Sequence, residues 1–379
     1  MMEYKFKDIV SNCCERIDPS ESDSIPYVGL EHISADTFNI QTYGKSTDVK
    51  GQKFIMKKGD VLFGRRRAYQ RKVAIAPFDG IFSAHGMIFR PKQVIDESLL
   101  PFFIRSDAFM NKAISLSVGS LSPTLNWGAI KDITFSIPSK EIQPELSSLL
   151  WKIEDDIERL KEQIQSLDIL VKSRFIEMFG NLDINDKQWK MSTIGESAKV
   201  PLHYGSTASA VDYDSETRYV RITDIGSDGK LNDDFKSPST YDSSYLLNKG
   251  DILFARSGSV GVTYLFDEDY KSIFAGYLIR FIPDDEKLDP EFTYQFTRSS
   301  YCQGILVGSK RGGVQKNVNA KQLSAIPIPL PPMDLQKEFV DFVHQVDKSK
   351  FELQKHLDDT KRLQKALINQ AFDPKSVQN

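Results

Sequence analysis

The sequence predicts an α/β (α+β) fold in which two similar tandem domains are separated by two long antiparallel coiled-coil helices, with a pseudo-two-fold relation between the halves. Three observations predict this architecture. The chain of 379 residues repeats itself once, each half contains short apolar runs typical of strands, and each half ends in a long run with apolar residues at helical spacing. The length is also comfortable for two domains.

The internal repeat consists of four matches that occur in the same order in both halves. In the clearest match, the run KGDVLF at 58–63 returns as KGDILF at 249–254. Four matches in the same order, at separations of 191 to 193 positions, are not a chance result. The matched segments are 27–33 with 219–225, 58–65 with 249–256, 82–91 with 274–283, and 126–138 with 319–331.

A long helical run follows each repeat. Apolar residues recur in steps of three and four from Ile142 to Val171 and again from Leu335 to Leu367, and both runs end on an aromatic residue before a helix breaker, at 179–180 and 372–374. Each helix would be roughly 55 Å long at about 1.5 Å per residue. Such a helix needs a partner, which antiparallel packing of the two would provide. The alternative is that each stripe packs on its own domain.

The globular halves contain short apolar runs bounded by glycine, proline and charge, which is typical of strands. Short helices are expected near 99–111 and 289–299. The Lys-Gly-Asp segment before each Val/Ile-Leu-Phe run predicts a turn in which glycine supplies an unusual backbone angle. The strand runs are 61–63, 73–75 and 87–89 in the first half and 252–254, 262–264 and 278–281 in the second.

Charge is distributed unevenly along the chain. The net charge is −3, yet residues 44–92 contain 12 Lys and Arg against 3 Asp and Glu, the balance that a nucleic-acid surface requires. Residues 181–333 contain 17 against 20, so the second half is not basic. The three cysteines and five histidines have no metal-ligand spacing, and no run is long enough for a membrane span. We therefore expect a cytoplasmic protein without a metal site.

Two loops in each half are candidates for contact with DNA. The run GRRRAYQRK at 64–72 combines five cations with an aromatic and an amide, and arginine can pair bidentately with guanine as glutamine can with adenine. Its counterpart at 255–261 has one cation. A second loop, at 117–124 and again at 308–317, has glycines that permit close approach to phosphate. The alternative for each loop is a solvated loop with no partner.

The residues predicted to contact DNA follow from these loops. His85 and Tyr277 occupy corresponding positions after the runs 82–84 and 274–276. For these two residues we expect a buried structural role at least as much as a position facing a DNA groove. The predicted contacts are Arg65, Arg66, Arg67, Tyr69, Gln70, Arg71, Lys72 and Ser120 in the first half, and Arg256, Ser257, Ser259, Lys310, Arg311, Gln315, Lys316 and Asn317 in the second.

Motifs of catalysis are not found in the sequence. It has no GxxxxGK[ST] nucleotide-binding loop, no glycine-rich cofactor fingerprint and no Asn-Pro-Pro-aromatic segment of amino-methyltransferases. The acidic run 283–287 is interpreted as a surface loop, because a metal-nuclease motif needs its carboxylates and lysine on separate strands. We expect no catalytic residues.

In these features the chain resembles the specificity (S) subunit of type I restriction-modification enzymes. The resemblance covers nearly the whole chain. It divides the chain into a first target recognition domain at 1–140, a first spacer helix at 141–180, a second target recognition domain at 181–333, and a second spacer helix with a C-terminal tail at 334–379. It rests on the segments Tyr27-Val28 and Tyr219-Val220, the two Gly-Asp-Val/Ile-Leu-Phe runs, the proline-ended strands before Gln143 and Gln336, and the helix ends 173–179 and 365–372.

The resemblance implies that each domain reads one half of a bipartite site in double-stranded DNA and that the helices act as a ruler. It implies two modification (methyltransferase) subunits that methylate adenine with S-adenosylmethionine, and restriction (motor-nuclease) subunits that use ATP and Mg. None of these cofactors would be bound by this chain. The alternatives are a self-contained DNA methyltransferase or nuclease, and a coiled-coil scaffold that does not bind DNA.

Overall fold

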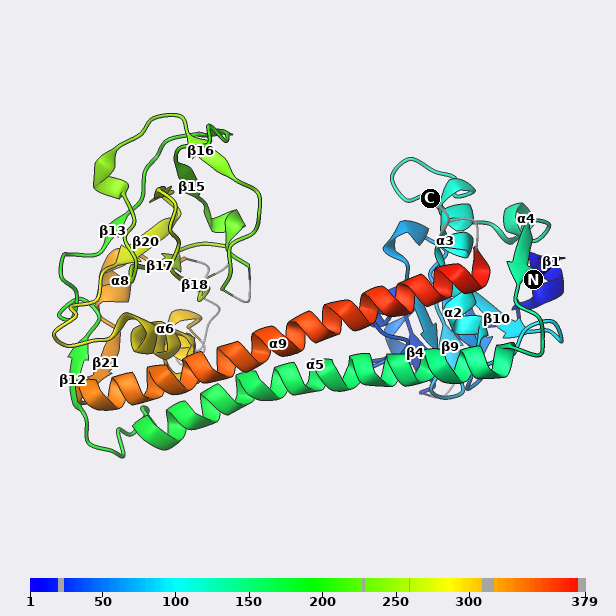
Figure 1. The fold of residues 1–379 in the computed structure, drawn as a ribbon, viewed down its shortest axis with the longest axis horizontal. Helices are drawn as coiled ribbons and strands as arrows, with labels where there is room; N and C mark the ends of the chain where they lie inside the picture. The colour runs from blue at the N-terminus through cyan, green and yellow to red at the C-terminus, as the bar shows by residue number, and fades with distance from the viewer. Residues whose placement is uncertain (20–23, 227–228, 259, 309–316, 374–379) are drawn as a thin grey trace. The chain divides into compact units, whose positions relative to one another are not determined.

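The computed structural model describes residues 1–19, 24–226, 229–258, 260–308 and 317–373. It divides into two compact units, Met1–Ile164 with Glu352–Asn379, and Gln165–Phe351. The division falls inside the two long helices, so that each unit contains one globular domain together with parts of both helices (Figure 1).

Two sheets and a strand pair form the first domain, together with four helices, α1 (Phe6–Ile9), α2 (Leu100–Arg105), α3 (Asp107–Ser115) and α4 (Trp127–Ile130). The first sheet is antiparallel, in the order β2 (Val10–Cys13), β10 (Met87–Pro91), β7 (Val61–Phe63) and β8 (Val73–Ile75). The second has the order β3 (Arg16–Ile17), β6 (Lys53–Met56), β9 (Gly80–Phe82), β4 (Pro26–Val28) and β5 (Gly44–Lys45). Strand β1 (Met2–Lys5) pairs with β11 (Thr134–Ile137).

The second domain repeats this pairing. Its strands β13 (His203–Tyr204), β20 (Leu278–Phe281), β17 (Ile252–Ala255) and β18 (Thr263–Leu265) follow the order of the first antiparallel sheet. Strand β15 (Arg218–Val220) runs parallel to β19 (Ser272–Phe274), as β4 does to β9. The other elements are β12 (Lys190–Thr193) with β21 (Pro327–Leu330), β14 (Ala210–Asp212) with β16 (Lys236–Pro238), and helices α6 (Pro290–Arg298), α7 (Ser300–Leu306) and α8 (Ala320–Ser324).

The predicted Lys-Gly-Asp turns are confirmed. Gly59 and Gly250 have φ values of 89° and 91°, a region that glycine occupies at little cost. The aspartate that follows each glycine is buried and paired with an arginine of the neighbouring strand. Asp60 lies 2.5 Å from Arg90, and Asp251 lies 2.6 Å from Arg280. The repeated turn therefore places an ion pair at the same point of both domains.

The two long helices are α5 (Gln143–Phe179) and α9 (Met333–Phe372), which confirms the two helices expected after the repeats. Each has a buried glutamine in its first turn, Gln143 in α5 and Gln336 in α9. The Gln143 side chain accepts a hydrogen bond from the Asp96 amide (2.7 Å) and donates to the carbonyls of Val94 and Pro138. Gln336 makes the same three bonds, with Asp289, Lys287 and Pro331. An equivalent anchor thus joins each helix to its domain.

Within each unit the helices run antiparallel. In the first unit, Ile157 and Leu160 of α5 share an apolar cluster with Leu357 of α9, and Gln364 donates to Glu154 (2.7 Å). In the second unit, the ring of Phe175 lies 5.5 Å from that of Phe339, while Lys350 and Asp168 are 2.6 Å apart. Residues later in α5 therefore meet residues earlier in α9.

The apolar stripes also pack on the domains. Leu150 and Ile368 belong to the core of the first domain, and Phe179 and Phe339 to that of the second. Leu150 and Phe339 thus pack on the domain of their own half, as the alternative expected, whereas Ile368 and Phe179 pack on the domain of the other half. No helix among the described residues could cross a membrane.

Candidate nucleic-acid interface

The two candidate loops of the first half lie side by side in the first unit. The Arg67 amide donates to the Pro123 carbonyl (2.7 Å), and the Leu125 amide donates to the Arg65 carbonyl (3.0 Å). Residues Arg66 and Thr124 form an isolated β-bridge. The strand end at Phe63 and the return into α4 fix both loops, so the fold joins two segments that are more than 50 residues apart in the sequence.

The second unit brings its two loops together in the same way. The Val318 amide donates to the Arg256 carbonyl (2.8 Å), and Ser257 forms an isolated bridge with Asn317. A third contact differs by one residue: the Arg256 amide donates to the Tyr277 carbonyl (3.1 Å), whereas in the first domain the amide of Arg66, the residue after Arg65, donates to the His85 carbonyl (3.2 Å). The Val318 bond matches the bond from Leu125 to Arg65, and the bridge matches the bridge of Arg66 with Thr124, so Arg65 and Arg256 hold equivalent positions in the two domains.

The arginines at the start of the first loop differ in their exposure and in their hydrogen bonds to the protein. Arg66 and Arg67 are exposed, and Arg65 is half-buried. Arg65 donates to the Ala84 carbonyl (3.1 Å), but its buried Nε has no hydrogen-bond partner in the described part of the chain. Among the described residues, no carboxylate forms an ion pair with any of these three arginines. The exposed guanidinium groups of Arg66 and Arg67 are therefore free of any described carboxylate and accessible to an acidic group.

Positive charge accumulates around this loop. Burial lowers the pKa of Arg65, and the charge of Arg16 lowers it further. Burial also lowers the pKa of His85, with additional effects from Arg66, Arg65 and Lys53. Cations that depress one another's pKa values mark an electropositive surface, which attracts phosphate. Arg16 and Lys53 were missed as contributors because no local pattern links them to residues 64–72.

The last two cations of the loop, Arg71 and Lys72, bind other groups of the same domain. Arg71 lies 2.5 Å from Asp107 and 3.1 Å from the Arg105 carbonyl, and Lys72 donates to the Leu30 carbonyl (2.6 Å). Tyr69 and Gln70, between the arginines, are exposed. Ser120 is exposed in the neighbouring loop, next to Leu121, which is 89% exposed. The contact roles of all these residues stay predictions.

In the second unit, Arg256 lies over the ring of Tyr204, 4.8 Å from its centroid. The hydroxyl of Tyr204 accepts a hydrogen bond from the Ala320 amide (3.0 Å), which holds the ring in place. Among the described residues, the buried Nε of Arg256 has no hydrogen-bond partner, as in Arg65. Tyr204 was missed because the repeat has no visible sequence match at 203–204. Of the other predicted contacts, Ser257 is half-buried and Asn317 exposed, whereas Ser259, Lys310, Arg311, Gln315 and Lys316 lie outside the described residues.

Ion pairs engage several cations of the second domain. Several of its surface cations are neutralised by neighbouring aspartates, and in the part of the chain that the structure describes Arg256 takes part in no ion pair. The pairs are Lys199 with Asp285, Arg221 with Asp234, Lys236 with Asp212, and Lys249 with Asp269, at 2.5 to 2.9 Å. The paired cations therefore add little positive potential around Arg256, whose own charge no described carboxylate neutralises.

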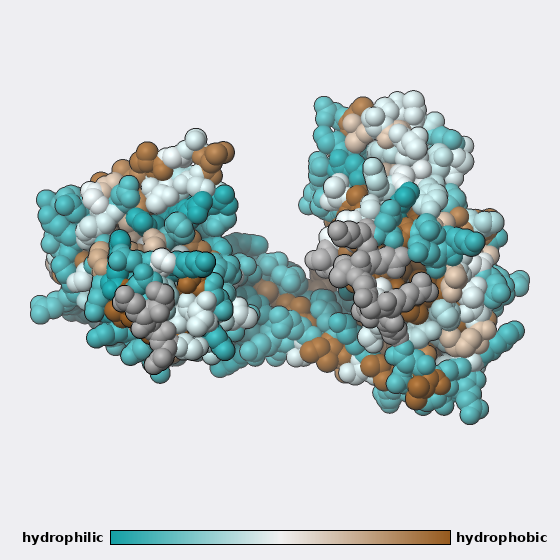
Figure 2. Space-filling view, turned by 180° about the vertical axis from the view of Figure 1, so that it is seen from behind, coloured by the Kyte–Doolittle hydropathy of each residue, from teal (hydrophilic) through white to brown (hydrophobic). Residues whose placement is uncertain are grey.

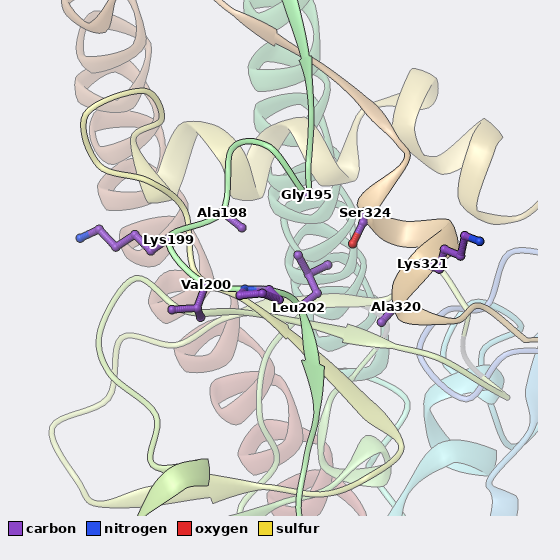
Figure 3. Close-up of a pocket in the computed structure, with 9 residues that line it drawn as sticks. Gly195, Ala198, Lys199, Val200, Leu202, Ala320, Lys321 and Ser324 are labelled. Carbon is purple, nitrogen blue, oxygen red and sulfur yellow. The ribbon is translucent and has the colours of Figure 1, made fainter.

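A pocket of about 400 Å³ opens in the second unit between the segment after β12 and helix α8. Figure 3 shows Leu202 and Ala320 lining it while the ammonium groups of Lys199 and Lys321 point away to either side. The repeat places Trp127 of the first domain at the position of Ala320, so the smaller side chain leaves space here. The pocket contains none of the predicted DNA contacts. No group of three His, Cys, Asp or Glu among the described residues is arranged to hold a metal ion.

Comparison with known proteins agrees with the repeat. The family described as "Type I restriction modification DNA specificity domain" matches residues 1–168 and 186–360. A protein of Methanocaldococcus jannaschii, named type I restriction enzyme MjaVIII specificity subunit, is 22% identical over 345 residues, which cover 85% of this chain and 79% of that protein.

Two solved structures have a similar fold. One, described as "Structural basis underlying complex assembly and conformational transition of the type I R-M system", has a TM-score of 0.58 at 19% identity and covers 98% of this chain and 97% of its own. The S subunit of a type I restriction-modification system from M. genitalium has a TM-score of 0.55 at 13% identity, with coverage of 98% and 96%. With two matched copies that span most of its length, the chain belongs to the type I restriction modification DNA specificity domain family.

Proposed function

We propose that this chain is the sequence-specific, non-catalytic specificity subunit of a type I restriction-modification complex. Each domain reads one half of a bipartite DNA site and directs partner subunits to methylate adenine or to cleave. The observation that carries the proposal is the pair of equivalent arginines, Arg65 and Arg256. Each follows the strand end of its domain where two loops pack together, and no described carboxylate forms an ion pair with either of them. The accessible part of each guanidinium group suits a phosphate or a guanine edge.

Two readers on one chain solve a problem of discrimination. A wrong base pair costs about 1–3 kcal/mol, so a domain that reads three or four base pairs discriminates poorly among the many sites of a genome. Two domains roughly add their penalties. If continuous helices hold the domains apart, the complex also requires a defined spacing between the half-sites. Helices α5 and α9 fit that role, because α5 continues without a break for 37 residues and α9 for 40 residues.

The helices also offer surface to partner subunits. Apolar side chains remain exposed on them after the helices have packed, and Figure 2 shows brown, apolar groups gathered over the helical part of the chain. Exposed apolar groups of this kind mark interaction sites. We assign them to the two modification subunits, which bring S-adenosylmethionine, while the restriction subunits bring ATP and Mg. This chain itself binds none of these. The exposed residues are Leu149, Ile169, Leu170 and Ile176 on α5, and Phe351 and Leu363 on α9.

The test uses the chain assembled with its modification subunits. Replacing Arg65, Arg66 and Arg67 with alanine should abolish discrimination at one half-site, and Arg256→Ala should weaken the other. Each lost phosphate contact should also reduce the slope of log affinity against log salt by about 0.9. Arg362→Ala is the matched control, since this arginine is 78% exposed on α9. Unchanged methylation specificity in both loop variants would overturn the proposal, as would adenine methylation by the purified chain alone.

The ruler is tested by lengthening both helices together. Seven residues inserted after Leu160 and seven before Leu357 keep the apolar stripes in phase. The insertion adds about 10 Å to each helix at about 1.5 Å per residue, which corresponds to about three base pairs at about 3.4 Å each. The complex should then prefer a site whose spacer is about three base pairs longer. An unchanged spacer would show that the helices do not set it.

A further inference from the structure

The first candidate loop contains an unusual turn. Arg67 and Arg71 have φ values of 56° and 53°, and they enclose the 3-10 turn η4 (Ala68–Gln70). Residues with a β-carbon rarely adopt this left-handed conformation, because it costs free energy that other contacts must offset. Two such residues four positions apart therefore indicate that the surroundings hold the turn in one shape.

Contacts between the inner side of the turn and the rest of the domain fix its shape. Ala68 is buried, and its carbonyl accepts the Arg71 amide (2.9 Å). The Arg71 guanidinium donates to the Arg105 carbonyl (3.1 Å) and to the Asp107 carboxylate (2.5 Å). Arg71 therefore ties the end of the turn to the junction of α2 and α3.

Asp107 is in turn held by the last turns of α9. The Asn369 amide donates to its second oxygen (3.1 Å), and the Lys365 ammonium lies 3.5 Å from the same atom. Both carboxylate oxygens are thus engaged, one by the loop and one by the helix. We call Arg71, Asp107, Lys365 and Asn369 the clamp. In Figure 1 the end of α9, drawn in red, lies beside α2 and α3.

The second domain lacks this arrangement. The repeat places Ser300 at the position of Asp107 and Ile176 at that of Asn369. Serine cannot form the ion pair that Asp107 makes, and isoleucine cannot donate the hydrogen bond that Asn369 makes. The clamp therefore belongs to the first domain alone and is no part of the common framework of the fold.

The outer side of the turn presents Tyr69 and Gln70. Tyr69 is 53% exposed, and Gln70 is also exposed. A glutamine amide can pair with both hydrogen-bonding groups of an adenine edge, and a tyrosine can donate to a base or stack on one. Such contacts discriminate only when the side chains are held in a fixed position.

We propose that Asp107 is a positioning residue which, through Arg71, holds Tyr69 and Gln70 as the base-reading pair of the first domain. Arg71 then acts inward and makes no contact with phosphate. The end of helix α9 thereby contributes to the specificity of the first half-site. This inference rests on the proposed function and adds to it the residues that read and the residues that position.

The assembled complex tests the proposal by its methylation rates on the preferred duplex and on duplexes with single base-pair changes in each half-site. Asp107→Asn and Asn369→Ala should reduce discrimination about ten-fold or more at the first half-site and leave the second unchanged. Gln70→Ala should lose discrimination at one position of the first half-site. Asp132→Asn is the matched control, because this carboxylate pairs with Lys7 on the surface of the same domain (2.7 Å).

Arg71→Ala separates the clamp from a phosphate contact. The clamp predicts lost base discrimination with an unchanged salt slope, whereas a phosphate contact predicts a slope lower by about 0.9 with discrimination retained. The second result would overturn the inference, as would full discrimination in Asp107→Asn. Hydrogen exchange of α3 and α9 confirms that each variant is folded. If the alanine variants of Arg65–Arg67 lose the first half-site while Asp107→Asn does not, the clamp fails and the proposed function stands.

Discussion

Replacing Gln336 with alanine should loosen helix α9 from the second domain. The side chain is fully buried at the start of the helix, where it makes hydrogen bonds of 2.8, 2.9 and 2.9 Å with three backbone groups. One of these is the amide of Asp289, the residue that caps α6. The variant therefore removes contacts from two helices at once.

The magnitude follows from the bonds that are lost. A buried hydrogen bond contributes about 1 kcal/mol net, and a buried group left without a partner costs about 1–3 kcal/mol. With three bonds broken and some relief from water entering the space, we expect a loss of about 3–5 kcal/mol in local stability. Gln143→Ala should cost a similar amount in the first unit, because its side chain is also buried and makes the same three bonds.

Native-state hydrogen exchange is the appropriate assay, because a chain with two units need not unfold in one step. In Gln336→Ala, faster exchange should be confined to α6 and the first turns of α9. Gln163→Ala is the matched control, since this glutamine is exposed on α5 and alanine favours helix. A loss below about 1 kcal/mol, or faster exchange spread evenly over both units, would refute the anchoring role.

Three further predictions concern charge and ionisation. Asp251→Asn should destabilise the second domain by about 3–5 kcal/mol, because it leaves the buried Arg280 without its charged partner. Chemical denaturation would measure the loss of stability, and an unchanged stability would contradict the prediction. Burial raises the pKa of Cys302 to about 12, so a thiol-alkylating reagent near neutral pH should modify exposed Cys14 and spare Cys302 in the folded chain, as peptide mass spectrometry would show. Burial works to raise the pKa of Asp107, but hydrogen bonds from Asn369 and Arg71 together hold it below its ordinary value. The stability that Asp107 contributes should therefore be complete above about pH 4 and lost as the pH falls through the lowered pKa, so that thermal unfolding of the wild type and of Asp107→Asn converges in acid.

The repeat and the helical periodicity were sufficient to predict the architecture. A helix can be predicted from local sequence, because apolar residues three and four positions apart lie on one face of it. The helix expected at 141–180 corresponds to Gln143–Phe179. The Lys-Gly-Asp turns were equally predictable, since only glycine adopts their backbone angle cheaply. Tandem copies of the same local patterns then implied two domains of the same fold.

The arrangement of the candidate interface could not be predicted in this way. Composition identified residues 64–72 as a cationic loop, but it could not separate Arg66, which is exposed, from Arg71, which pairs with Asp107. Nor could it place Tyr204 beneath Arg256. These contacts join residues far apart in the chain, so they depend on how strands and helices pack and leave no periodic trace in the sequence. Local chemistry thus indicates which segments carry charge, whereas packing decides which of those charges face outward.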